Sequence, residues 1–157
     1  MSMTITTATE TTTPSLAGIL DRYAHLGWPM VRIITGLLLI PHGAQKLFGW
    51  FGGHGLAATG QFFDSALGMS PGILWAGLAG SVEFFAGLAL VLGILTRPAA
   101  LAVAVLLFVA LTVHIPAGFF WTNGGIEYPL MWAVLALAIF LKGGGAYSLD
   151  ARLGLRI

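Results

Sequence analysis

The sequence from Ile33 to Trp50 decides the fold, and it reads Ile-Ile-Thr-Gly-Leu-Leu-Leu-Ile-Pro-His-Gly-Ala-Gln-Lys-Leu-Phe-Gly-Trp. It begins as an apolar run, and a proline, a histidine, a glutamine and a lysine follow before that run has ended. Polar groups at such depth in a membrane are costly, so they usually face a protein interior. On a helix, His42 and Lys46 share a face with Leu39. The stretch therefore predicts a membrane-spanning helix with a polar stripe turned toward partner helices.

The composition of the whole chain agrees with a membrane protein. Of its 157 residues, 57% are hydrophobic and 8% are charged, and the mean hydropathy is +0.91. A soluble domain has about 25% charged residues, so this chain cannot make a water-facing surface. The net charge of +1 gives no basic patch, so a nucleic-acid partner is not expected. Cysteine is absent, which excludes disulfides, thiolate metal sites and a cysteine nucleophile.

The apolar segments predict an all-α, integral membrane four-helix bundle. We expect a disordered tail over residues 1–13 and one four-span domain over residues 14–157. The last apolar segment is short for a span, because about 20 residues are needed to cross the hydrocarbon. Its helix must therefore start near residue 126. The predicted spans cover about residues 28–48, 72–95, 98–115 and 126–142.

Two short helices are expected outside the spans. Between Pro14 and the first span, apolar residues recur on one side of a helix, which predicts a helix lying in the membrane interface. The loop 49–71 predicts a second amphipathic helix, resting on the outer face of the bundle. We interpret it either as a lid or as packing between spans.

Lysine and arginine residues predict the orientation. The loops 49–71 and 116–126 contain neither residue type. The N-terminal segment, the loop at Arg97 and the C-terminal tail all contain them. By the positive-inside rule, both termini of this multi-pass protein are expected on the cytoplasmic side of the membrane.

The second predicted span carries small residues and a carboxylate on one stripe. Ala76, Gly80, Glu83 and Gly87 follow helical spacing. Small residues let neighbouring backbones approach closely in lipid. Glu83 is therefore expected to face the interior of the bundle.

Estimated depth brings polar residues from all four predicted spans into the outer half of the bundle. The candidates for a pocket or binding site are His42, Gln45, Lys46, Glu83, His114 and Glu127. Three interpretations stay open. The first is an ion-pair network that fixes helix register, in which Arg32 or Lys46 neutralises Glu83.

The second interpretation is a pocket for a small oxidisable molecule or a quinone headgroup, because histidine can hydrogen-bond a quinone carbonyl and relay its protons. The third is a metal site with ligands from His42, His114, Glu83 and Glu127. The nearby Lys46 would repel a metal cation, so no metal is expected.

Several stretches resemble the DoxX family of small bacterial and archaeal membrane proteins. The likeness runs from about Arg32 to Asp150. The matching elements are Arg32 with Gly36, the stretch 41–49 (Pro-His-Gly-Ala-Gln-Lys-Leu-Phe-Gly), the stretch 80–87 (Gly-Ser-Val-Glu-Phe-Phe-Ala-Gly), Leu92-Gly93, Thr96-Arg97, His114, Gly125-Ile126-Glu127 and Ser148-Leu149-Asp150. The resemblance implies a four-helix membrane bundle. Family members are associated with thiosulfate:quinone oxidoreductase and with redox-defence enzymes.

With this resemblance, we expect a bacterial inner-membrane protein that is a subunit or partner of a quinone-linked redox system, with a polar pocket in the outer half of the bundle. No sequence motif encodes a cofactor, and a quinone is the cofactor that we consider. No catalytic residue is assigned. The expected partners are the lipid bilayer and other membrane or redox subunits, with a second copy of the chain as a further candidate. The alternative function is a non-catalytic membrane scaffold or a small-solute carrier.

Overall fold

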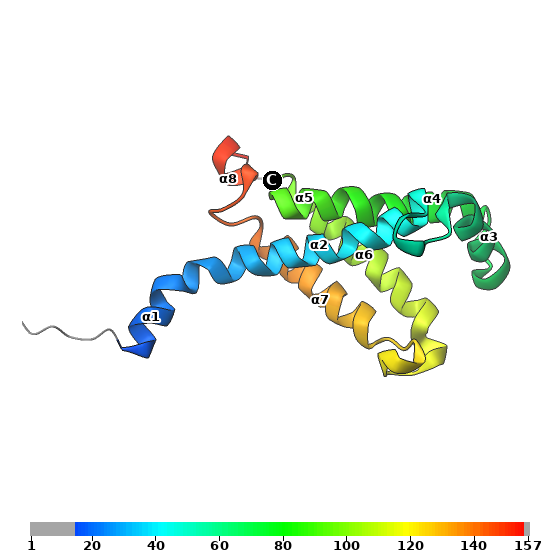
Figure 1. The fold of residues 1–157 in the computed structure, drawn as a ribbon, viewed down its shortest axis with the longest axis horizontal. Coiled ribbons are helices and arrows are strands. Elements are labelled where there is room, and N and C mark those ends of the chain that lie inside the picture. The colour runs from blue at the N-terminus through cyan, green and yellow to red at the C-terminus, as the bar shows by residue number, and fades with distance from the viewer. Residues whose placement is uncertain (1–14, 156–157) are drawn as a thin grey trace, which may run out of the picture.

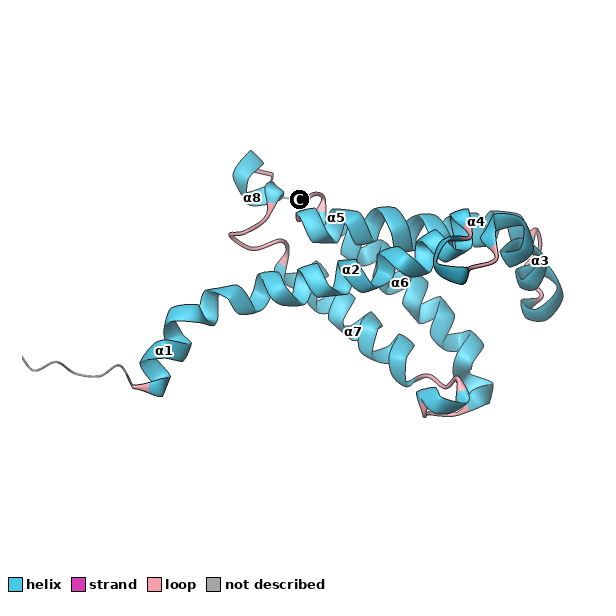
Figure 2. Ribbon diagram, viewed as in Figure 1, coloured by secondary structure: helices cyan, strands magenta, loops and turns pink. Residues whose placement is uncertain are grey.

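The computed structural model describes residues 15–155. The tail predicted over residues 1–13 lies outside this range. Helices and short connecting loops make up the described part of the chain, and no strand occurs in it (Figure 2). The all-α class predicted from the sequence is confirmed.

Within residues 15–155, three segments are long and apolar enough to cross a membrane. They are Leu16–Phe48, Gly72–Leu92 and Thr96–Ala117. The first contains α1 (Leu16–Tyr23), η1 (Ala24–Leu26) and α2 (Gly27–Phe48), the second contains α4 (Gly72–Ser81), η3 (Val82–Ala86) and α5 (Gly87–Leu92), and the third contains α6 (Thr96–His114) and η4 (Ile115–Ala117). Many of their large apolar side chains are exposed, as lipid contact requires. The protein is thus a membrane protein with three long apolar helices.

The turn between the second and third segments differs from the prediction. The second helix ends at Leu92 rather than at residue 95, because Gly93 has a left-handed φ of 69° and closes it. The next helix begins at Thr96 rather than at residue 98. The carboxylate of Asp150 accepts hydrogen bonds from the amides of Leu95 (2.8 Å) and Thr96 (2.9 Å), which caps this helix start from a distant part of the chain.

The fourth predicted span corresponds to α7 (Glu127–Lys142). This helix begins one residue later than expected and has 16 residues. At about 1.5 Å per residue it is about 24 Å long, which is less than the ~30 Å hydrocarbon core. α7 is therefore shorter than a typical membrane-spanning helix.

The remaining helices are short. α3 (Gly55–Leu67) lies in the predicted outer loop and α1 in the predicted N-terminal helix region. Ser15 caps α1 by accepting the amide of Gly18 at 3.1 Å. The other short helices are η2 (Trp50–Gly52), η5 (Trp121–Asn123) and α8 (Leu149–Leu153). Placement of α1 and α3 at the two membrane surfaces stays a prediction.

The long helices form two pairs (Figure 1). α2 runs beside the continuous α4–η3–α5 helix, and α6 packs against α7. Glycines bring the first pair together: a Cβ on Gly36 would lie 2.4 Å from the carbonyl oxygen of Gly87, and one on Gly43 would lie 2.6 Å from that of Gly80. The close approach predicted from the small-residue stripe is confirmed.

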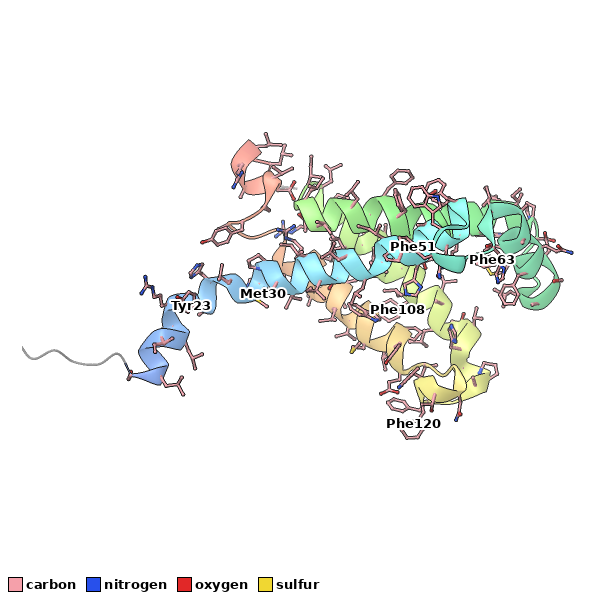
Figure 3. The ribbon with its side chains drawn as sticks, in the orientation of Figure 1. Tyr23, Met30, Phe51, Phe63, Phe108 and Phe120 are labelled. Carbon is pink, nitrogen blue, oxygen red and sulfur yellow. The ribbon has the colours of Figure 1, made fainter. Side chains whose placement is uncertain are left out.

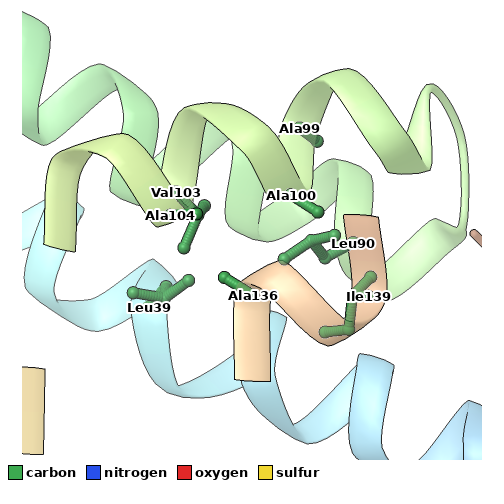
Figure 4. Close-up of a cluster of buried hydrophobic side chains, with 8 residues drawn as sticks. All are labelled: Leu39, Leu90, Ala99, Ala100, Val103, Ala104, Ala136 and Ile139. Atoms are coloured by element: carbon green, nitrogen blue, oxygen red, sulfur yellow. The ribbon is translucent and has the colours of Figure 1, made fainter. Parts of the chain in front are cut away.

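The two pairs meet around one cluster of buried apolar side chains (Figure 4). Leu39 from α2 and Leu90 from α5 face small residues of α6 and two residues of α7 there. The full cluster is Leu39, Leu90, Ala99, Ala100, Val103, Ala104, Ala136 and Ile139. From this contact, the α6–α7 pair diverges from α2 toward the loop that joins α6 to α7 (Figure 1).

Arg32 and Asp150 lie at the end of the molecule where the two helix pairs stay in contact. Arg32 is 1% exposed, and its guanidinium donates to the carbonyl oxygens of Leu90, Val91 (3.0 Å) and Tyr147 (2.8 Å). Asp150 is also buried, and its own amide donates to Gly93 at 2.8 Å. We call Arg32, Asp150 and these hydrogen-bond partners the Arg32–Asp150 cluster. It ties α2, α5, α6 and α8 together.

Candidate functional site

A cleft of about 1140 Å³ lies where the two helix pairs diverge. This volume exceeds the ~300–1,000 Å³ of typical small-molecule pockets. Its walls are mostly apolar and include several aromatic rings. The lining residues are Leu38, Leu39, His42, Lys46, Phe63, Met69, Trp75, Leu78, Ala79, Val82, Glu83, Ala102, Val105, Leu106, Leu107, Val109, Ala110, Val113, His114, Trp121, Gly124, Gly125, Tyr128, Pro129, Met131 and Trp132.

The segments that border the cleft come from different parts of the chain. Figure 3 labels Phe63 on α3 and Phe120 on the loop after α6, which lie apart on the side of the molecule opposite α1. Phe63 lines the cleft, whereas Phe120 lies outside its lining and is 63% exposed. The α3 helix therefore contributes to one wall of the cleft, and its role as a lid or as packing stays a prediction.

A π-helical turn places a carboxylate in the wall of the cleft. The η3 segment Val82–Ala86 has π-helical hydrogen bonding and interrupts the helix between α4 and α5. Such turns are rare and are frequently found at functional sites. Here the turn holds Glu83, and the Glu83 side chain is 13% exposed.

Lys46 is the partner of Glu83. Its ammonium donates to both carboxylate oxygens, at 2.8 Å and 2.6 Å, and lies 3.5 Å from the carbonyl oxygen of His42. The Lys46 side chain is 25% exposed. The pair is therefore neutral as a unit but still reachable from the cleft.

Arg32, the other cation considered for Glu83, lies in the Arg32–Asp150 cluster and donates to backbone carbonyls there. No salt bridge joins Arg32 to Glu83 within residues 15–155. Arg32 and Lys46 are both long cations on α2, so the sequence alone could not decide which of them pairs with Glu83.

Two histidines line the cleft in different ways. His42 is exposed on α2, and no hydrogen bond involves its ring among the described residues. His114 is half-buried at the end of α6, and its Nδ1 lies 2.5 Å from the carbonyl oxygen of Gly124. The loop 118–127 is itself held by backbone hydrogen bonds from Gly125, Ile126 and Glu127 to residues 118–120. The orientation of His114 is thus fixed and that of His42 is not.

Gln45 and Glu127 lie outside the lining of the cleft. The Gln45 amide donates to the carbonyl oxygen of Phe51 at 3.2 Å, and the Glu127 carboxylate accepts the amide of Trp121 at 3.1 Å. Both side chains organise loops beside the cleft. Of the six sequence candidates, the structure brings His42, Lys46, Glu83 and His114 to one cleft.

The metal interpretation has no donor set in the described part of the chain. Within residues 15–155, no three His, Cys, Asp or Glu side chains gather closely enough to hold a metal ion. Glu83 is engaged by Lys46, and Glu127 by the loop amide of Trp121.

Sequence reasoning missed the roles of two carboxylates outside the spans. Asp64 on α3 accepts the amide of Gly72 at 2.9 Å and so joins α3 to the start of α4. Hydrogen bonds from the Ser70 hydroxyl and the Gly72 amide lower the pKa of Asp64 below its ordinary value. Burial alone would raise the pKa of Asp150, but hydrogen bonds from Thr96 and Leu95 and the charge of Arg32 bring it below its ordinary value.

Comparison with known proteins identifies relatives of this chain. The family model described as DoxX matches residues 27–115, which is more than half of the chain. An uncharacterized protein of Haemophilus influenzae is 32% identical over 103 residues, which cover 64% of this chain and 68% of that protein. No solved structure is a significant match.

Proposed function

The chain belongs to the DoxX family, and on that premise we propose that it is a subunit or partner of a quinone-linked redox system in a bacterial inner membrane. The cleft is the proposed binding site for the quinone. The proposal rests on one observation: a large, mostly apolar cleft contains a single charged pair and two histidines.

The cleft has the donor set that a quinone requires. A lipophilic ring and tail match apolar and aromatic walls, of which Trp75, Tyr128 and Trp132 form part. The oxygens of the headgroup need hydrogen-bond donors or acceptors. Lys46 offers an ammonium that is 25% exposed, and His42 and His114 offer ring nitrogens.

The roles of the protein groups follow from this arrangement. A bound quinone would supply the chemistry of two-electron, two-proton exchange. Lys46 is positioned to donate a hydrogen bond to a headgroup oxygen, and Glu83 keeps its ammonium oriented. The ring nitrogens of His42 and His114 can hydrogen-bond the oxygens of the headgroup. The apolar walls exclude water from the bound ring.

Electrons have to come from another protein. The chain contains no cysteine and carries no motif for a nucleotide or haem cofactor. A separate redox subunit is therefore part of the proposal, and the protein contributes the membrane site.

The membrane arrangement is also proposed here. We place α7 as a fourth, tilted or sheltered span, because it packs along α6 and its ends carry Glu127 and Lys142. Both termini are then cytoplasmic, and the cleft lies in the outer half of the bundle. Reporter fusions at Gly53 and Gly154 should report opposite compartments. Fusions that report the same compartment would contradict four spans.

The experiment that tests the function is a measurement of bound quinone. The protein is purified in lipid nanodiscs made with a fixed mole fraction of a short-chain ubiquinone analogue, and its quinone content above that of empty discs is measured by extraction. Wild-type protein should hold about one equivalent. Lys46→Met should lose most of it, because the cationic donor is gone.

Lys142→Met is the matched control. Lys142 lies outside the cleft, with its ammonium 4.4 Å from the ring centre of Trp28. This variant should keep the wild-type quinone content. If wild-type protein holds no quinone above that of empty discs, the proposed site is wrong, and the scaffold or solute-carrier function becomes the better explanation.

A further inference from the structure

His114 has one ring nitrogen whose protonation is decided by its neighbour. A carbonyl oxygen can only accept a hydrogen bond, so the contact between Nδ1 and Gly124 requires the proton on Nδ1. In the neutral ring the other nitrogen, Nε2, then carries a lone pair and is an acceptor. This tautomer is assigned from the hydrogen-bond partner.

The acceptor is available to a ligand. His114 lines the cleft, and no described residue makes a hydrogen bond with its Nε2. The other strong acceptor of the cleft, the Glu83 carboxylate, already receives Lys46 on both oxygens. His42 has no partner that fixes its tautomer among the described residues. His114 is therefore the oriented acceptor of the site.

We propose that the cleft selects molecules whose headgroup carries a phenol-type hydroxyl, with that hydroxyl donating to Nε2 of His114. A hydroxyl satisfies the lone pair, whereas a carbonyl or an ether oxygen offers it nothing. Binding a headgroup without a donor leaves the acceptor unpaired in an apolar cleft, which is costly. This inference rests on the proposed function, and it assigns the reduced, hydroxyl-bearing form as the better ligand.

A matched pair of redox-inert ligands tests the selection. A 4-alkylphenol and its methyl ether have the same ring and tail and differ in the hydroxyl donor. Both are titrated at equal bilayer mole fractions into nanodiscs with ¹⁵N-histidine-labelled protein, and ring-nitrogen shifts report binding and protonation. The phenol should bind about tenfold more tightly, which corresponds to ~1.4 kcal/mol. The Nε2 resonance of His114 should start as that of an unprotonated nitrogen and move on phenol binding.

Two ring-preserving variants locate the effect. His114→Phe should bring the phenol-to-ether ratio close to one while both ligands still bind. His42→Phe, which removes the other cleft histidine, should keep the tenfold ratio. If His114→Phe does not fold, the ¹⁵N spectrum of wild-type protein decides the question, because a protonated Nε2 before ligand addition overturns the proposal.

The outcomes separate this inference from the proposed function. Equal binding of phenol and ether by wild-type protein shows a lipophile site without hydroxyl selection, and it overturns the inference alone. A preference that survives in His114→Phe also overturns the inference alone. Failure of both ligands to bind overturns the cleft as a lipophile site and the inference with it.

Discussion

The Arg32–Asp150 cluster and the Lys46–Glu83 pair are two polar centres on the same helix pair, and they differ in how completely they are enclosed. The Arg32 guanidinium is 1% exposed and is held by three carbonyl oxygens and the nearby Asp150 charge. Lys46 is 25% exposed, and Glu83 is its only side-chain partner among the described residues. The first centre lies where the helix pairs close, and the second lies where they open into the cleft.

This difference suggests a division of work along α2. Arg32 satisfies backbone carbonyls at the end of α5 and before α8, so its hydrogen bonds connect segments that are far apart in sequence. Lys46 contacts one side chain on the adjacent helix and faces an open volume. Burial strengthens the hydrogen bonds of a centre that holds the fold, whereas a centre that binds a ligand must be reachable by it.

Loss of Arg32 should therefore be the most damaging of the polar changes. Arg32→Ala leaves three carbonyl oxygens and Asp150 without the buried Arg32 cation, and we expect a loss of about 3–5 kcal/mol in the free energy of unfolding. Lys46→Ala should cost about 1–2 kcal/mol, since the cleft allows Glu83 some hydration. Thermal unfolding in detergent measures both.

Arg22→Ala is the control for removal of a charge alone, because Arg22 is exposed on α1. It should melt like the parent. Equal destabilisation by Arg32→Ala and Lys46→Ala would erase the distinction between the two centres.

Asp150 should make stability dependent on pH. Its pKa in the folded protein is below the ordinary value of about 3.9, so folding favours the ionised form. The stabilisation is complete above that ordinary value and is lost as the pH falls through the lower folded pKa. Asp150→Asn should cost about 2 kcal/mol at pH 7, because charged acceptors make the stronger hydrogen bonds.

The difference in melting temperature between the parent and Asp150→Asn should shrink steadily as the pH is lowered from 5 toward 3. A constant difference over this interval would mean that the charge of Asp150 does not contribute to stability and that only the shape of its side chain does.

The sequence predicted much of this fold because lipid imposes simple rules. Apolar length and glycine spacing located the long helices and the close contact of α2 with α4 and α5. Helical spacing also placed His42 and Lys46 on one face and turned Glu83 inward. Apolar length and residue spacing are local properties, so they can be recognised in a single sequence.

The remaining features depend on contacts between distant residues. The choice between Arg32 and Lys46 as partner of Glu83 depends on how α2 packs against the adjacent helix, and no local pattern predicted the π-helical turn that contains Glu83. The role of Asp150 depends on amides that lie 54 and 55 residues away. Glu127 and Gln45 were assigned to the site by depth alone, and depth does not say which way a side chain points.

The central claim is that the cleft binds a quinone-type headgroup, and native tryptophans allow a direct test. Trp132 lines the cleft, whereas Trp28 lies outside it and donates to the carbonyl oxygen of Gly143 at 2.9 Å. Two variants, each with four Trp→Phe changes, retain only Trp132 or only Trp28. A short-chain ubiquinone analogue is titrated into nanodiscs that contain each variant, and tryptophan fluorescence is followed. Quenching of Trp132 should saturate and should lose its saturation in Lys46→Met, while quenching of Trp28 should rise in proportion to the quinone in the bilayer. Identical, unsaturated curves for both tryptophans would contradict a binding site in the cleft.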